Sequence, residues 1–146
     1  MPAMKTFTRN IIMAVVMLLA VGSGSTMAQQ LRDANYNIVG KIAANGTVRN
    51  GNYDPIGYFN NDGTIANAKS KTVGRIDAKM QIFNKDGERI GYITADGAVN
   101  DGESNVLGYI EVKSGKVTTP TGEVLGFANG ISLQRVAAYY FFDFFK

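Results

Sequence analysis

A glycine recurs along most of the chain at an almost fixed interval. The intervals are 17, 17, 17, 17 and 18 residues, and the positions are Gly40, Gly57, Gly74, Gly91, Gly108 and Gly126. A constant period of this size is the signature of a repeat protein, in which each unit packs against a copy of itself. The period constrains the architecture strongly but marks no single position for chemistry, so evidence of function must come from places where the copies differ.

Each unit carries the same apolar pattern around this glycine. A large aliphatic residue precedes the glycine and another apolar residue follows it two positions later, as in the stretch Ile56 to Phe59. Most copies have a second glycine six residues after the first, as in Asp62-Gly63 and Asp96-Gly97. Asn-Gly and Asp-Gly between apolar runs predict tight hairpin turns, because these residues tolerate a positive φ angle best. We therefore expect two very short strands per unit and no helix between Leu31 and Ala128.

The chain departs from the regular pattern at two turns. The third copy has Lys79-Met80 where the others have Asp-Gly or Asn-Gly, and its flanking loop 67–72 contains no glycine, so we expect this unit to be less tightly turned. The fifth copy has one extra residue around 111–115, which predicts a bulge or a longer turn. The remaining turn signals follow the rule and are Asn50-Gly51, Asp86-Gly87, Asp101-Gly102 and Thr121-Gly122.

Two all-β architectures fit a period of 17. A β-solenoid stacks its coils and leaves open ends, whereas a radial array of hairpins closes on itself. Hexapeptide solenoids prefer 18 residues per coil, and turns that reverse the chain every eight or nine residues favour antiparallel hairpins. We therefore expect a radial array of short antiparallel β-hairpins. Each hairpin of such an array is called a petal here. The sequence does not decide between five and six petals, because six glycines bound five intervals.

The repeated motif resembles that of a known family. The stretch Ile90 to Val99, with copies at Val39 to Val48 and Ile56 to Ile65, is similar to the 5-fold β-flower family of exported proteins in Bacteroides-type bacteria. The resemblance covers about residues 31 to 145. It implies a small flower of β-hairpins around a pseudo-symmetry axis, and it implies no activity, catalytic residue or ligand.

The N-terminal 28 residues have the pattern of a secretory signal peptide. Lys5 and Arg9 precede an apolar run from Ile11 to Val21, and a small-residue stretch ends at Ala28. The run is too short to span a bilayer as a permanent helix. We therefore expect a signal peptide at 1–28, a repeat domain at 29–130 and an aromatic helix at 131–146. The expected location is periplasmic, outer-membrane-associated or secreted, and the absence of cysteine argues against a lipoprotein.

The composition gives little support to catalysis, cofactors or nucleic acid. Residues 29–146 contain 13 Lys and Arg against 12 Asp and Glu, so no basic surface for nucleic acid is indicated. The chain has no His and no Cys, which removes the usual general base and thiolate nucleophile. We expect neither an enzyme nor a cofactor site. A calcium site is not expected either, because turn chemistry explains the acidic residues before glycines, which are Asp62, Asp86, Asp96 and Asp101.

The aromatic tail is one candidate for function. Ser132 can cap a helix, and several apolar residues recur at helical spacing: Leu133, Val136, Ala137, Tyr140, Phe141 and Phe144. We expect this helix to dock over one end of the flower. Two interpretations remain open for the opposite face. Tyr139, Phe142 and Phe145 could contact a second copy, an envelope protein or the membrane, or the tail could plug the flower and use these rings along its rim.

The position after each recurrent glycine is the other candidate. Side chains there lie on the face that the glycine does not occupy. Tyr58, Tyr92 and Tyr109 could form a stacking platform for glycans, or they could provide cross-strand packing that stabilises small sheets. The sequence thus predicts a non-enzymatic exported structural or protein-interaction module of the bacterial envelope, with a glycan-binding module as the alternative.

Overall fold

Twelve short strands form one closed antiparallel barrel in the computed structural model, which describes residues 29–145. The expected signal peptide at 1–28 lies outside the described residues. Each strand pairs with its neighbours in sequence, and β1 pairs with β12 to close the ring. The strands are β1 (Gln29–Asp33), β2 (Ile38–Ile42), β3 (Thr47–Asn50), β4 (Pro55–Phe59), β5 (Thr64–Asn67), β6 (Thr72–Ile76), β7 (Gln81–Asn84), β8 (Arg89–Ile93), β9 (Ala98–Asp101), β10 (Val106–Ile110), β11 (Lys116–Thr118) and β12 (Val124–Phe127). The predicted radial all-β fold is confirmed.

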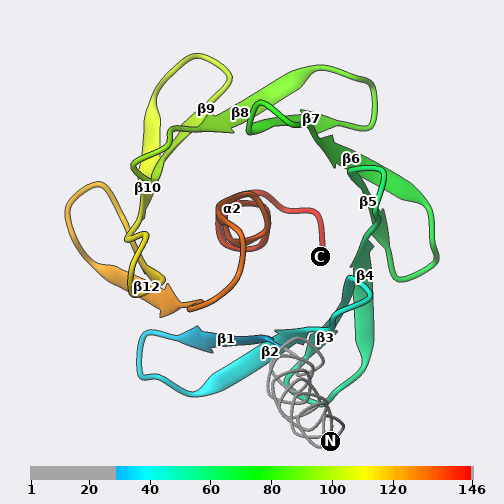
Figure 1. The fold of residues 1–146 in the computed structure, drawn as a ribbon, viewed down its shortest axis with the longest axis horizontal. Helices are drawn as coiled ribbons and strands as arrows, with labels where there is room; N and C mark the ends of the chain where they lie inside the picture. The colour runs from blue at the N-terminus through cyan, green and yellow to red at the C-terminus, as the bar shows by residue number, and fades with distance from the viewer. Residues whose placement is uncertain (1–28, 146) are drawn as a thin grey trace, which may run out of the picture.

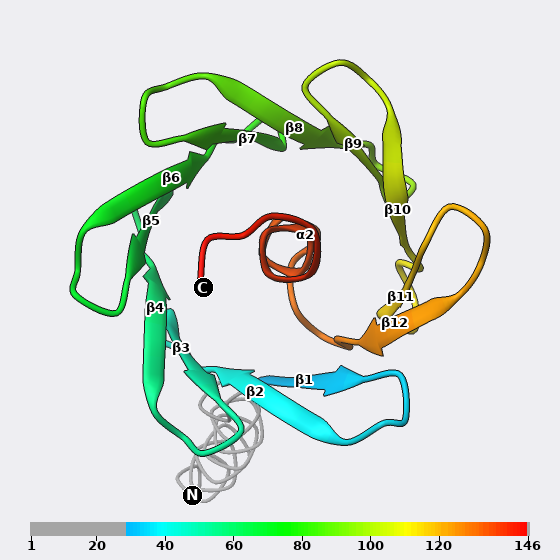
Figure 2. The same ribbon diagram turned by 180° about the vertical axis from the view of Figure 1, so that it is seen from behind.

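The strands are grouped as hairpins that point away from the centre of the ring (Figure 1). Each odd-numbered strand and the even-numbered strand after it form one petal, so the described residues build six petals. Figure 2 shows the same ring from behind. The 17-residue period equals one four-residue strand, a four-residue outer turn, one five-residue strand and a four-residue inner turn, as in residues 47–63.

The outer turns are capped by the side chain of the last residue of the odd-numbered strand. Oδ1 of Asn50 accepts hydrogen bonds from the backbone N–H groups of Asn52 and Asp54, at 2.9 and 3.0 Å. The left-handed residue is Tyr53, with φ 72°, and Gly51 has no positive φ. The turn predicted from Asn50-Gly51 is therefore present, but Tyr53 takes the positive φ angle. The asparagine is selected as a cap, and the same geometry recurs at Asp33, Asn67, Asn84 and Asp101.

The inner turns need a left-handed residue where glycine recurs. Gly46, Gly63 and Gly97 have φ between 92° and 97°, and Met80 takes the same place in the third copy with φ 64°. The bond from the Met80 N–H to the Asp77 carbonyl is 3.3 Å, against 2.9 to 3.0 Å at those glycines. The N–H of Asp77 donates to the carbonyl of Gln81 at 3.1 Å, against 2.9 Å at the equivalent places, so the expected looseness is limited to slightly longer bonds in a turn that is formed.

The fifth inner turn is longer, as the extra residue predicts. The N–H of Gly115 donates to the carbonyl of Glu111, and the N–H of Glu111 donates to the carbonyl of Lys116, so this turn contains one residue more than the others.

The core consists of stacked rings of aliphatic side chains. In all six petals a fully buried residue pairs across the petal with the recurrent glycine of the neighbouring strand, as Val48 does with Gly57. The register shifts next to this glycine, and the extra residue is the preceding aliphatic one, such as Ile56. The fully buried ring comprises Leu31, Val48, Ile65, Ile82, Val99 and Val117.

Helix α2 (Leu133–Phe141) lies inside the ring and is seen almost end-on in Figures 1 and 2. Ser132 caps it by accepting a hydrogen bond from the N–H of Arg135, and Val136, Ala137 and Ala138 are buried. The expectation of a helix over 131–146 docked on one end of the flower is therefore corrected in length and in place. Phe142 is extended, so the last residues leave the helix. No helix within residues 29–145 has the length and apolar character needed to cross a membrane.

The capping role of Asn50 predicts an asymmetric result for two asparagines in one turn. Asn50→Ala leaves two N–H groups without their acceptor and should lower the free energy of unfolding by about 1 kcal/mol. Asn52→Ala removes an exposed side chain and should change it by less than about 0.5 kcal/mol. Urea unfolding of both variants measures the difference, and equal effects would contradict the cap.

The aspartate caps predict a loss of stability in acid. The N–H of Asn105 is the largest cause that lowers the pKa of Asp101, and the N–H of Asn37 has this role at Asp33. A lowered pKa in the fold adds stability that is present above the unfolded value of about 3.9 and is lost as pH falls through the folded value. The variant with Asp33→Asn and Asp101→Asn keeps an uncharged acceptor, as Asn50 does. It should match the parent at pH 7 and lose less stability than the parent at pH 3 in urea titrations, and parallel losses would contradict the prediction.

Candidate functional site

The aromatic tail places one ring against each recurrent glycine. A Cβ atom at Gly57 would lie 2.3 Å from Cδ1 of Phe145, and one at Gly91 would lie 2.4 Å from Cζ of Phe142. Real Cβ atoms do not approach other atoms so closely. At all six recurrent glycines a backbone carbonyl oxygen of a neighbouring strand also lies 2.2 to 2.8 Å from the Cβ position, so glycine is required by the strand backbone and by the tail ring together. The pairs are Gly40 with Tyr139, Gly57 with Phe145, Gly74 with Phe144, Gly91 with Phe142, Gly108 with Phe141 and Gly126 with Tyr140.

Successive aromatic residues of the tail contact successive petals, so the contacts make one full circuit of the barrel. Starting at β2 and passing through β12, β10, β8, β6 and β4, the partners run in sequence from Tyr139 to Phe145 and omit only Asp143. Successive helical residues are about 100° apart, whereas six petals are spaced at about 60°. The helix therefore has to end near Phe141 if the later rings are to reach their own petals.

The structure places the three residues of the candidate partner surface in contacts that differ from the sequence expectation. Tyr139, Phe142 and Phe145 are half-buried, and each lies at the glycine of a different petal. They also border a hollow of about 260 Å³ where the tail turns back. These rings therefore do not form one exposed helix face, and the interpretation of the tail as a plug describes their contacts.

Tyr140 ties the tail to the seam where the ring closes. Its hydroxyl donates to the carbonyl of Arg32 at 2.6 Å, and its ring lies at Gly126 of β12, the strand that pairs with β1. Burial is the largest cause that raises the pKa of Tyr140 above its ordinary value. The hydroxyl therefore stays protonated and remains a hydrogen-bond donor.

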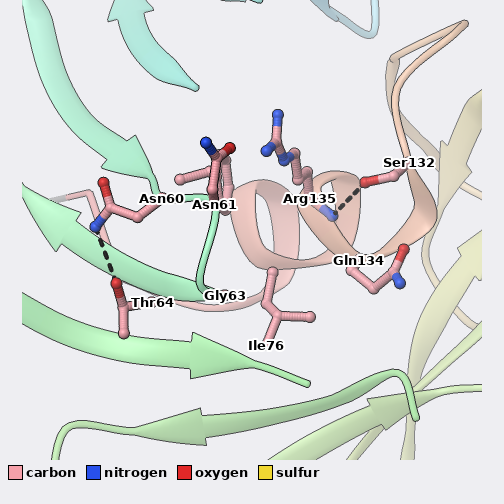
Figure 3. A pocket seen from close by; sticks show the side chains of 9 residues that line it. Asn60, Asn61, Gly63, Thr64, Ile76, Ser132, Gln134 and Arg135 are labelled. Carbon is pink, nitrogen blue, oxygen red and sulfur yellow. Dashed lines mark hydrogen bonds between the residues drawn. The ribbon is translucent and has the colours of Figure 1, made fainter. Parts of the chain in front are cut away.

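A polar cleft lies at the other end of the helix, between α2 and the inner turn that joins β4 to β5 (Figure 3). The helix packs against β7, β8 and β10, and Phe144 and Phe145 lie at β6 and β4, so the β4–β6 side is not filled near Ser132. The cleft has a volume of about 230 Å³. Its lining residues are Phe59, Asn60, Asn61, Gly63, Thr64, Ile76, Ser132, Gln134 and Arg135.

Arg135 supplies the charge of this cleft. Its guanidinium carbon lies 5.2 Å from the centre of the Phe59 ring, a cation–π contact that orients the group. Burial lowers the pKa of Arg135, and no carboxylate among residues 29–145 forms an ion pair with it. A half-buried guanidinium without a counter-charge is poised to bind an anion, and its planar fork suits a carboxylate.

Amide groups from both walls of the cleft lie near this charge. Figure 3 shows Asn61 on the turn and Gln134 on the helix, and neither side chain is bonded within residues 29–145. Asn60 is oriented by the bond from its Nδ2 to Oγ1 of Thr64, at 2.9 Å. Such groups can donate to or accept from the hydroxyls of a small polar ligand. No group of three or more His, Cys, Asp or Glu side chains that could hold a metal gathers within residues 29–145.

Sequence reasoning missed this cleft. Asn60 and Asn61 belong to a regular turn, and Arg135 looks like one of the few solubilising residues of an apolar helix. One signal was present, because in helical projection Arg135 falls between Ala138 and Tyr139 rather than on a separate polar face.

The structure does not gather the three candidate tyrosines into one platform. Tyr58, Tyr92 and Tyr109 lie on β4, β8 and β10, so one strand separates the last two and three strands separate the first two. Tyr92 donates to Oγ of Ser104 at 2.9 Å, and Arg89 lies 4.9 Å from its ring centre. Tyr109 is 44% exposed on the outer face. Each could contact a ligand alone.

The fold and its plug define a class of protein: a closed ring of radial β-hairpins with a C-terminal aromatic plug. A family model described as 5-fold beta-flower protein matches residues 28–145. The chain therefore belongs to the 5-fold β-flower family, and in this chain six petals are formed. Searches of curated proteins and of solved structures gave no match.

The contact between ring and glycine predicts a coupled pair of substitutions. Gly57→Ala should cost roughly 1 to 3 kcal/mol of unfolding free energy, because the new Cβ overlaps Phe145 and lies 2.7 Å from the carbonyl oxygen of Ala66. In a Phe145→Ala background the first overlap is gone, so the cost of Gly57→Ala should fall by at least about 0.5 kcal/mol. Denaturant unfolding of the four proteins in this cycle measures the coupling.

Gly51→Ala is the control for this cycle. Gly51 lies in the same petal and has no positive φ, and the nearest atoms to its added Cβ are 3.8 Å away. This substitution should change stability by less than about 0.5 kcal/mol. If the changes in unfolding free energy caused by Gly57→Ala and Phe145→Ala simply add, the proposed contact between Gly57 and the Phe145 ring is contradicted.

Proposed function

We propose that this protein is an exported, non-enzymatic binding module of the bacterial envelope, and that its ligand is a glycan unit bearing a carboxylate. The observation that carries the proposal is the half-buried Arg135 guanidinium, which faces a polar cleft and has no carboxylate partner in the part of the chain that the structure describes. A charge in such a place is less screened by solvent ions than one on the open surface. A bound carboxylate would supply the missing counter-charge and two hydrogen bonds.

The other groups of the cleft favour a sugar acid over a simple anion. Asn61 from the inner turn and Gln134 from the helix offer amide donors and acceptors in the same cleft as the guanidinium, and such groups suit a ligand with several hydroxyls. The cleft is small for a drug-sized ligand, so it suits one terminal unit rather than a chain. Glycans of this kind are available to a protein exported by a signal peptide at 1–28.

The protein-interaction alternative has less support from the geometry. It required Tyr139, Phe142 and Phe145 to be available on the surface. These aromatic side chains pack against the recurrent glycines of the strands instead. The glycan class is therefore retained, with its site moved from the separated tyrosines to the Arg135 cleft.

An NMR titration tests the proposal. Glucuronate and galacturonate should shift backbone N–H signals of residues 60–64 and 132–135, whereas glucose and galactose should shift them little at the same concentration. Arg135→Gln should weaken the binding of the acid by about tenfold or more. Arg135→Lys keeps the charge but lacks the fork and should be intermediate.

Arg89→Gln is the matched control, because Arg89 also lies over an aromatic ring but is exposed and outside the cleft. It should leave the affinity unchanged. Thermal melting of each variant separates lost binding from lost folding. Equal binding by Arg135→Gln, or no binding of any sugar acid, would contradict the proposed function.

A further inference from the structure

A strip of aromatic and basic side chains lies on the outside of the first two petals, away from the Arg135 cleft. Tyr36 and Tyr53 stand at the tips of these petals and are 59% and 56% exposed. Arg32 lies 4.3 Å from the centre of the Tyr36 ring, and Arg49 lies 4.8 Å from that of Tyr53. Each arginine also donates to the carbonyl of its tyrosine, at 2.8 and 3.0 Å, so both rings are held in place.

The two tyrosines occupy turn positions whose backbone conformation is unfavourable for a large side chain. Both have a positive φ, 70° and 72°, in a backbone region that disfavours bulky side chains. The equivalent residues of the other petals are small: Ser70, Gly87, Ser104 and Gly122. Folding alone therefore gives no reason for a large exposed ring at these two tips, and strained residues of this kind concentrate at functional sites.

The strip is continuous across neighbouring strands. Nη2 of Arg32 donates to Oε1 of Gln30 at 2.6 Å, and Gln30 is the register partner of Lys41 on β2. Nζ of Lys41 lies 5.1 Å from the centre of the Tyr53 ring. At the other end, the Tyr36 ring meets the edge of Phe127 on β12, with 5.2 Å between the ring centres.

The charge of the strip is not neutralised by the protein. Arg32, Lys41 and Arg49 have no ion pair within residues 29–145, and Asp33 directs its carboxylate to the N–H groups of its own turn. The surrounding part of the ring is basic as well. Residues 29–83 contain seven Lys and Arg against four Asp and Glu, whereas residues 84–128 contain four against seven.

We infer that this strip is a second binding site, which takes an acidic polysaccharide along the outside of petals one and two. Sugar rings would pack on the exposed parts of the Tyr36 and Tyr53 rings, while carboxylates or sulfates along the chain would pair with Arg32, Lys41 and Arg49. The stacking arginines fix the rings before the ligand arrives, which reduces the entropy lost on binding. This inference stands on residues separate from the Arg135 cleft.

Binding of polygalacturonate and of a sulfated polysaccharide to the full chain, measured by biolayer interferometry at low and moderate salt, tests the strip. The variant with Tyr36→Ser and Tyr53→Ser should bind at least tenfold more weakly. It should melt no lower than the parent, since serine already fills this turn position at Ser70 and Ser104. The variant with Lys41→Gln and Arg49→Gln should also bind more weakly and should show a shallower dependence on salt.

Tyr109→Ser is the control, because it removes an exposed outer tyrosine from the acidic part of the ring and should leave binding unchanged. Inorganic polyphosphate and anionic vesicles supply the same charge without sugar rings. Unchanged polysaccharide binding by the tyrosine variant would overturn the inference, as would binding of polyphosphate or vesicles to the parent as tightly as the polysaccharide. Arg135→Gln should not alter this binding, so failure of the strip and failure of the cleft are distinguishable.

Discussion

The contact between a tail ring and a strand glycine is the interaction on which the rest of the structure depends. Short, glycine-rich strands bury little apolar surface by themselves, and a ring of six petals has a wide centre to fill. The tail fills it with one aromatic side chain per petal. At five glycines a ring atom lies within 2.8 Å of the place that a Cβ would need, and at Gly40 the hydroxyl of Tyr139 lies 3.3 Å from it. Closure of the ring and order of the tail are therefore two aspects of one packing arrangement.

This arrangement also determines where the molecule is open to ligands. The aromatic side chains of the tail pack near the C-terminal end of the plug. The opposite end of α2 is therefore left with a polar cleft on the β4–β6 side, and Arg135 faces that cleft. The outer faces of the petals do not contact the plug, so their residues can differ from one petal to the next. Tyr36 and Tyr53 use this freedom at turns where other petals have serine or glycine.

The repeat predicted the fold because each copy repeats the packing of the others. It revealed the all-β class, the hairpins and the recurrent glycine. It did not reveal the aromatic ring at each glycine, since these rings come from a tail more than ten residues beyond the last copy and add to the crowding by a strand carbonyl oxygen. The helix was expected to continue to Lys146, because spacing alone cannot show that later rings must reach separate petals. Arg135 was overlooked for a similar reason: its missing partner is visible only when Phe59 and the inner turn are placed beside it.

Contacts between glycine α-protons and aromatic ring protons, measured by nuclear Overhauser spectroscopy on the labelled chain, test the central claim most directly. The structure predicts six cross-peak sets, one ring per recurrent glycine, with Tyr139 at Gly40 and then Tyr140, Phe141, Phe142, Phe144 and Phe145 at Gly126, Gly108, Gly91, Gly74 and Gly57. Gly87 and Gly122 lie in open outer turns and should show none. Rings that contact the glycines in another order, or recurrent glycines without any ring contact, would contradict the claim that the tail closes the flower petal by petal.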